Sequence, residues 1–156
     1  MTDALDRLVV FTSGPMQFGL DLDLVKEVVA ACEVSPLPDA PASIAGVVTI
    51  DGDVLPVVDP RWHFDRRGSS SLKIDTRFLL VRSSTGTIAI IADAVEGVRD
   101  VMRSALKAAE QLAGGMSLLR DVAATVGGMI YIFDPRGLLS PSDEAALQAA
   151  LNRLQP

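Results

Sequence analysis

The chain has 156 residues, a formal net charge of −6, and a single cysteine and a single histidine. This length suits one compact unit or two small lobes that share a core, and a hydrophobic fraction of 49% is too high for a disordered chain. One cysteine, Cys32, excludes an intramolecular disulfide and any multi-cysteine metal site. The acidic balance argues against nucleic-acid binding, which needs a basic surface.

The start of the chain predicts no targeting segment. Asp3 and Asp6 interrupt the positive start that a secretory signal needs, and no long apolar region follows them. The apolar runs are all far shorter than the ~20 residues that a membrane-spanning helix requires. We therefore expect a cytoplasmic protein without membrane insertion, in which Cys32 is a small buried residue rather than a reactive thiol.

The first part of the chain predicts two strands and a short helix. Residues 8–11 are a short apolar run, and residues 16–22 carry large apolar side chains at every second position, as a strand with one buried face does. Residues 23–30 favour a helix, because Asp23 is a good N-cap and apolar residues follow at spacings of three and four.

Two further strands are predicted on either side of a tight turn. Residues 45–50 and 54–58 are mostly apolar, and Asp51-Gly52 lies between them. An Asp-Gly pair favours a type I′ hairpin, because both central residues of this turn need a positive φ. Since nearly every residue of the two strands is apolar, we expect both of their faces to be covered.

Three landmarks of the first half return in the second. The segment Asp93–Val98 aligns with Asp23–Val28, a second hairpin is predicted within 125–130, and Asp134-Pro135-Arg136 repeats Asp59-Pro60-Arg61. Their shared order predicts an internal duplication.

The duplication predicts two small β-barrels packed side by side. Strands are expected at 77–82 and 87–92, after a polar linker at 65–75. Subdomain 1 is therefore placed at about 8–64 and subdomain 2 at about 76–139. Neither is long enough to bury a large core alone, so we expect the two to share one.

Two segments lie outside the duplication. Residues 104–113 are rich in helix-forming residues and are followed by a Gly-Gly pair, which predicts a short helix. Residues 140–156 predict an amphipathic C-terminal helix, with Ser140 as the N-cap and an apolar stripe further on. We expect this stripe to dock on the body of the protein; the alternative is that it forms a surface for a partner.

No catalytic motif accompanies this architecture. The sequence has no glycine-rich phosphate loop, no nucleophile elbow and no zinc-binding helix motif. His63, between two aromatic residues, is expected to be structural, and Asp51 and Asp53 are interpreted as turn residues rather than calcium ligands. We therefore expect no catalytic residue, metal, cofactor or small-molecule substrate, and a function that depends on a protein-binding surface.

An ordered set of segments resembles the CheW family, the adaptor domains of bacterial chemosensory arrays. The resemblance runs from about residue 8 to residue 139 and agrees with the duplication. The segments that carry it are Phe18–Leu22, Val25–Val28, Pro36–Pro41, Ile44–Val48, Val54–Arg61 and Asp93–Val98.

The resemblance implies both a fold and a function. The fold is a single CheW-like domain at 1–139, built from two five-stranded SH3-like barrels around a shared hydrophobic core, with the amphipathic helix at 140–156. The function is a non-enzymatic adaptor that couples the cytoplasmic tip of a chemoreceptor to the regulatory domain of a CheA-type histidine kinase. In the family, a helical hairpin lies in an apolar groove between the barrels. The positions that match partner-binding positions of the family are Val25, Glu27, Val28, Gly46, Val47, Ile50, Asp51 and Ile90.

The hairpin turn departs from the family pattern. The family usually reads Asn-Leu-Arg-Gly there, whereas this chain reads Thr49-Ile50-Asp51-Gly52. Asp51 thus replaces an arginine that, in the family, is thought to interact with the glutamate matched by Glu27. We therefore interpret the chain as a divergent member. The alternative is a CheW-fold scaffold of a non-flagellar system, for example a pilus-linked one, with a different protein partner.

Overall fold

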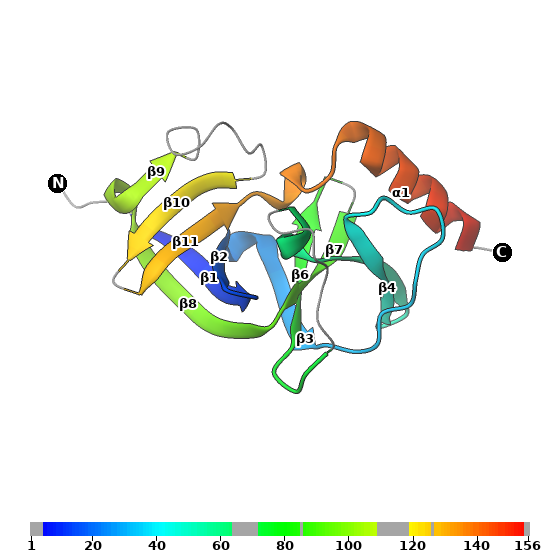
Figure 1. Cartoon of the computed structure of the whole chain (residues 1–156), viewed down its shortest axis with the longest axis horizontal. Coiled ribbons are helices and arrows are strands. Elements are labelled where there is room, and N and C mark those ends of the chain that lie inside the picture. Colours follow the sequence, from blue (N-terminus) through cyan, green and yellow to red (C-terminus); the bar gives the residue numbers. More distant parts are fainter. Residues whose placement is uncertain (1–4, 64–71, 85, 109–118, 126, 155–156) are drawn as a thin grey trace.

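The protein is mainly β, with one α-helix near its C-terminal end (Figure 1). The computed structural model describes residues 5–63, 72–84, 86–108, 119–125 and 127–154. The strands are β1 (Leu5–Ser13), β2 (Met16–Asp21), β3 (Val25–Ala30), β4 (Ile44–Ile50), β5 (Asp53–Val58), β6 (Arg77–Ser83), β7 (Gly86–Ala92), β8 (Ala94–Met102), β9 (Leu106–Ala108), β10 (Leu119–Thr125) and β11 (Gly128–Phe133). The helical segments are the 3₁₀ turns η1 (Leu22–Leu24), η2 (Pro60–His63), η3 (Arg103–Ala105) and η5 (Pro135–Gly137), and the helix α1 (Pro141–Leu154).

The strands form two sheets, which we call barrel A and barrel B. Barrel A has the order β8-β1-β2-β11-β10-β9 and barrel B the order β3-β6-β7-β5-β4. Within the described residues, barrel B has the five predicted strands, and barrel A has the three-residue β9 as a sixth. The chain after β3 closes barrel B, because Ser35 and Val47 exchange two backbone hydrogen bonds of 2.9 and 2.8 Å. The predicted fold class, two small β units with a C-terminal helix, is confirmed.

The two barrels do not follow the predicted boundary between 8–64 and 76–139. Barrel A takes β1 and β2 from the first half and β8 to β11 from the second, whereas barrel B takes β6 and β7 from the second half and β3 to β5 from the first. The antiparallel pairs β1–β8 and β3–β6 join the halves, as do the parallel pairs β2–β11 and β5–β7. The placement of each barrel in one continuous stretch of sequence is therefore wrong, because each half pairs its first hairpin with strands of the other.

This exchange preserves the duplication. Strands β1, β2, β3, β4 and β5 correspond in order to β6, β7, β8, β10 and β11. When each strand is replaced by its counterpart, the order β3-β6-β7-β5-β4 of barrel B becomes the order β8-β1-β2-β11-β10 of barrel A. The two Asp-Pro-Arg corners also match. The backbone N–H of Arg61 donates to Asp59, and that of Arg136 donates to Asp134, both at 3.0 Å. The predicted internal duplication is confirmed by this strand order.

Three hydrophobic clusters stabilise the arrangement. One fills barrel A, a second fills barrel B, and the largest lies between the barrels and receives side chains from both. Aromatic rings from Phe11, Phe18 and Phe133 meet in this shared cluster, with centroids 5.6 to 6.2 Å apart. The expected shared core is therefore present, and it is what joins the two barrels.

Two predicted helices are mostly strand. Residues 23–30 form the end of η1 and all of β3, and residues 104–108 form the end of η3 and β9; residues 109–113 lie outside the described part, as does most of the predicted linker. Three valines within six residues favour a strand over an eight-residue helix, which has little stability without packing. Cys32, predicted to be buried, is exposed.

The hairpin at Asp51-Gly52 and the C-terminal helix are confirmed. The two turn residues have φ angles of 51° and 85°, as a type I′ turn requires. Helix α1 begins after Ser140, whose Oγ accepts a hydrogen bond of 3.1 Å from the backbone N–H of Asp143. Leu147 is 1% exposed and belongs to the shared cluster, so α1 docks on the body.

Candidate partner-binding site

Strand β3 presents two valines at the margin of the shared core. It lies at one end of the strand order of barrel B and pairs with β6, so that Val25 lies opposite Val81 and Val28 opposite Leu79. Directly opposed residues share a face of the sheet, and both partners belong to the shared cluster. Val25 packs against that cluster, whereas Val28 is 42% exposed.

Strand β8 presents an equivalent pair from barrel A. Val95 lies opposite Phe11 and packs against the shared cluster, and Val98 lies opposite Val9 and is 58% exposed. Val95 and Val98 are therefore the counterparts of Val25 and Val28, as the alignment of Asp93–Val98 with Asp23–Val28 indicates. We refer to Val25, Val28, Val95 and Val98 as the valine rim.

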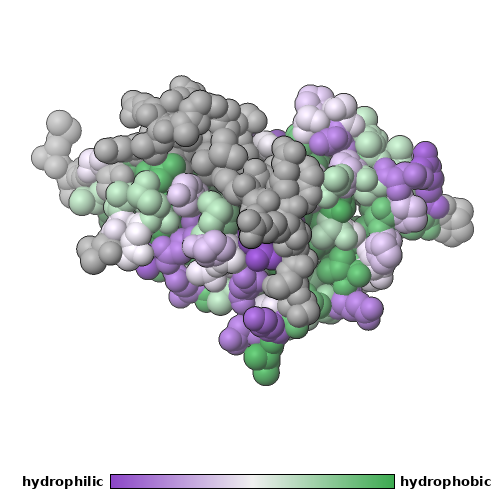
Figure 2. Space-filling model, viewed as in Figure 1, coloured by the Kyte–Doolittle hydropathy of each residue, from purple (hydrophilic) through white to green (hydrophobic). Residues whose placement is uncertain are grey.

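The valine rim lies among polar side chains. In Figure 1, β3 and β8 run along the lower side of the molecule, whereas α1 lies at the top. Figure 2 shows hydrophilic residues along the lower part of barrel A, where β8 exposes Glu96, Arg99 and Asp100. Arg99 pairs with Glu96 at 3.8 Å, so part of this charge is already matched within the strand. The rim thus offers exposed apolar groups in an otherwise polar setting, as protein-binding surfaces do.

Three of the residues predicted to bind a partner are buried. Ile90 is 0% exposed, in the shared cluster, and Val47 is 8% exposed. Gly46 has a φ of 152°, and a Cβ added there would lie 2.2 Å from the carbonyl oxygen of Ser35. In this structure Ile90 packs the core, and Val47 and Gly46 shape the closure of barrel B, so their contact with a partner stays a prediction that their burial does not favour.

The three remaining residues lie apart from the valine rim. Glu27 is exposed but lies opposite Leu80, so it belongs to the other face of β3 from Val28. Asp51 is exposed at the tip of the β4–β5 hairpin, and Ile50 is half-buried against the interior cluster of barrel B. Ile50 and Asp51 therefore belong to the hairpin tip, and Glu27 lies on β3 but not on the face that carries Val28.

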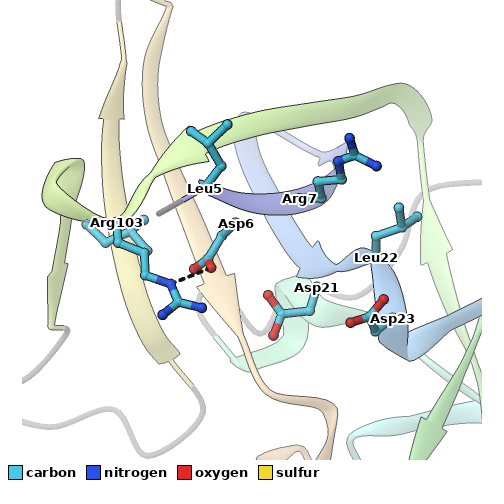
Figure 3. A pocket seen from close by; sticks show the side chains of 8 residues that line it. Leu5, Asp6, Arg7, Asp21, Leu22, Asp23 and Arg103 are labelled. Carbon is cyan, nitrogen blue, oxygen red and sulfur yellow. Dashed lines mark hydrogen bonds and ion pairs between the residues drawn. The ribbon is translucent and has the colours of Figure 1, made fainter. Parts of the chain in front are cut away.

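A wide hollow lies elsewhere, at the end of barrel A, and it is polar (Figure 3). Its volume is about 860 Å³, and Arg103 Nε donates to Asp6 Oδ1 at 2.9 Å inside it. Asp21 and Asp23 face the same space in Figure 3. The residues that line it are Leu5, Asp6, Arg7, Asp21, Leu22, Asp23, Arg103 and Leu106. An open polar hollow of this kind lacks the apolar enclosure typical of small-molecule sites.

Among the described residues, no group of three or more His, Cys, Asp or Glu side chains is placed to hold a metal ion. No helix in the described part of the chain is long and apolar enough to cross a membrane.

Comparison with known proteins identifies the family. The family model described as "CheW-like domain" matches residues 7–142, which is most of the chain. The chain belongs to the CheW-like domain family. The Chemotaxis protein CheW of Rhizobium meliloti is 26% identical over 148 residues, covering 92% of this chain and 93% of that protein. Protein FrzA of Myxococcus xanthus is 32% identical over 91 residues, covering 58% of this chain and 56% of that protein.

A solved structure agrees with the CheW-like fold. The scaffolding protein TtCheW from Thermoanaerobacter tengcongensis superposes with a TM-score of 0.79, over 91% of this chain and 92% of that one, at 24% identity. The sequence-based assignment to the CheW-like family is therefore confirmed. Val95 and Val98 were not among the predicted partner-binding residues, although the alignment of Asp93–Val98 with Asp23–Val28 makes them the counterparts of Val25 and Val28.

Proposed function

We propose that this CheW-like chain is a non-enzymatic, cytoplasmic adaptor of a bacterial chemosensory array. It binds the cytoplasmic tip of a chemoreceptor along the valine rim and the regulatory domain of a CheA-type histidine kinase through other surfaces. The observation that carries the receptor part is the pair of half-exposed valines, Val28 and Val98, at equivalent positions of the two barrels. Family membership and relatives named as chemotaxis proteins support the array.

The rim suits a helical partner. A helix places apolar side chains on one face at spacings of three and four residues, and such a face fits an apolar groove. Val28 and Val98 are 42% and 58% exposed, so burying each against a partner contributes on the order of 1 kcal/mol. Two such contacts give modest affinity, which suits an adaptor whose binding is reinforced by a second partner in the same assembly.

A second candidate function differs in the partner. Asp51 is exposed at the hairpin tip, where the family usually has arginine. Its negative charge selects against partners whose acidic groups would pair with that arginine. In this candidate, the chain is a CheW-fold scaffold of a non-flagellar system, and the hairpin tip binds a different protein.

Lysine substitutions on the rim test the first proposal. Val28→Lys and Val98→Lys place a charge against an apolar helix face, and each should weaken binding of a receptor-tip fragment at least tenfold, because desolvating an unpaired ammonium is unfavourable. Ala149→Lys, on the exposed side of α1, is the matched control and should bind normally. Binding is measured by calorimetry and folding by circular dichroism. Folded rim variants that bind as tightly as the control contradict the proposal.

A further inference from the structure

The two Asp-Pro-Arg corners of the fold, although equivalent by duplication, are closed by different means. At the first corner, the turn between β1 and β2 is held by Asp93, the residue that joins β7 of barrel B to β8 of barrel A: the Gly14 N–H donates to Asp93 Oδ2 at 2.7 Å. The Arg61 side chain, 14% exposed, covers the same turn, since a Cβ at Gly14 would lie 2.8 Å from its Cδ. This corner is a polar clamp between the barrels, in which the Arg61 and Asp59 side chains are mostly buried and the Gly14–Asp93 bond is exposed.

The described residues of the second corner are arranged differently. Arg136 is 70% exposed and pairs with Asp134, with Nη2 and Oδ2 2.7 Å apart. Asp23, the counterpart of Asp93, is exposed and lines the wide hollow of barrel A. A cavity of about 220 Å³ lies at this corner, bordered by Asp21, Leu24, Arg82, Ser83, Phe133, Asp134 and Arg136.

Helix α1, which has no counterpart among the described residues of the first half, contacts this open corner. The Ser84 hydroxyl of the β6–β7 turn donates to Glu144 Oε1 in the first turn of α1. Further along, Leu147 and Ala150 enter the shared cluster, and Arg153 Nη1 lies 2.7 Å from Asp39 Oδ2 in the segment between β3 and β4.

The path of the chain makes α1 a connection between the barrels. It follows β11 of barrel A through η5, and then lies beside β4 and β7 of barrel B (Figure 1). Its contacts to Ser84 and Asp39 are both with barrel B. A helix attached covalently to one barrel and packed on the other restrains the angle between them.

We propose that α1 is a strap that fixes the angle between the two barrels at the second corner, as the Gly14–Asp93–Arg61 clamp fixes it at the first. The valine rim lies along β3 and β8, one strand from each barrel, so this angle sets the separation of Val28 and Val98. This last consequence for binding rests on the proposed function; the strap itself does not.

Distance measurement between spin labels tests the strap on the full chain without any partner. One label is attached to Cys32, the only cysteine, which lies after β3, and the second to Ala124→Cys on β10; both positions are exposed. Leu147→Ala, which removes the main apolar contact of α1, should broaden or shift the distance distribution well below the unfolding temperature. Leu8→Ala is the matched control, because Leu8 is equally buried but lies inside barrel A.

The control separates the strap from general stability. Leu8→Ala should lower the unfolding temperature and leave the distance distribution unchanged. If Leu147→Ala does not fold, Glu144→Ala, which removes only the bond to Ser84, decides by the same measurement. If every folded α1 variant gives the same distribution as the doubly labelled chain that carries only Ala124→Cys, the proposal is overturned. Because no partner is used, that result leaves the proposed adaptor function standing.

Discussion

Asp51 occupies a backbone conformation that few side chains tolerate. Its φ of 51° places it in the left-handed region, where Asn, Asp and Gly are the usual residues. Its side chain is exposed at the tip of the hairpin, so its charge acts on partners more than on the fold.

Substitutions of Asp51 separate these two effects. Asp51→Asn keeps a residue suited to the turn, and we expect its free energy of unfolding to change by less than about 0.5 kcal/mol. Asp51→Arg restores the residue usual in the family but should cost about 1 kcal/mol, because its longer side chain is less suited to a positive φ. Urea denaturation measures both. Equal stability of the two variants contradicts the role assigned to the turn conformation.

The charge of Asp51 should appear in binding kinetics. If the hairpin tip meets a basic partner, Asp51→Arg slows association, and the difference from the unmodified chain shrinks as salt is added. Association rates with the cognate kinase regulatory domain, measured at low and high ionic strength, test this. Unchanged rates at low salt mean that the replacement of arginine has no part in binding the kinase regulatory domain.

Individual site residues could be predicted only in part. Val28 was recognised because it lies in a segment that resembles the family, and its exposure agrees with a contact role. The sequence did not show that Ile90 is buried and Val28 exposed, since both are β-branched residues in apolar strands. The difference comes from the strand order, which places β7 in the middle of barrel B and β3 at its end. The strand order decides which residues are buried, and a short sequence pattern does not contain that order.

At the scale of elements, β3 shows why a short apolar segment is ambiguous. Valines at positions 25, 28 and 29 fit the spacing of a helix face as well as an irregular strand. The strand has a register shift between Val25 and Glu27, so the apolar residues do not follow a simple period of two. The hairpin at Asp51-Gly52 was predictable because its turn has a specific local requirement.

The closure of barrel B depends on one glycine in β4. Gly46 lies at a register shift in the β4–β5 pair, and any Cβ there meets the carbonyl oxygen of Ser35, which accepts a hydrogen bond from Val47. Gly46→Ala should therefore destabilise the protein by more than about 2 kcal/mol, since the backbone itself must move. Gly127→Ala is the control: its nearest neighbour is 4.0 Å away and its φ is not in the left-handed region. Equal unfolding free energies for both variants contradict this account of the closure.

At the scale of the molecule, exchange of the first hairpins makes the two halves interdependent. The sequence predicted the duplication correctly, because its landmarks recur in order. It did not indicate which half supplies each hairpin, since β1–β2 and β6–β7 are equivalent and fit either barrel by pattern alone. Pairing across the halves is a long-range property that depends on the shared core between them.

Interdependence predicts how fragments behave. A fragment of residues 1–71 lacks β6, β7 and β8 to β11, and should be unfolded alone, as should residues 72–156. Co-expressed, the two should form one complex with the spectrum of the intact chain, because all inter-strand pairs can then form. Amide NMR spectra measure the outcome. A dispersed, native-like spectrum from either fragment alone is incompatible with the exchanged barrels.

The valine rim as a receptor-binding surface is tested most directly by valine-methyl NMR spectra during titration with a receptor-tip fragment. We predict that the methyl signals of Val28 and Val98, on the two edge strands, shift or broaden together as the fragment saturates the protein. Those of Val48 and Val57, inside barrel B, should stay in place. Saturable binding that moves other signals and leaves Val28 and Val98 unchanged would contradict the account.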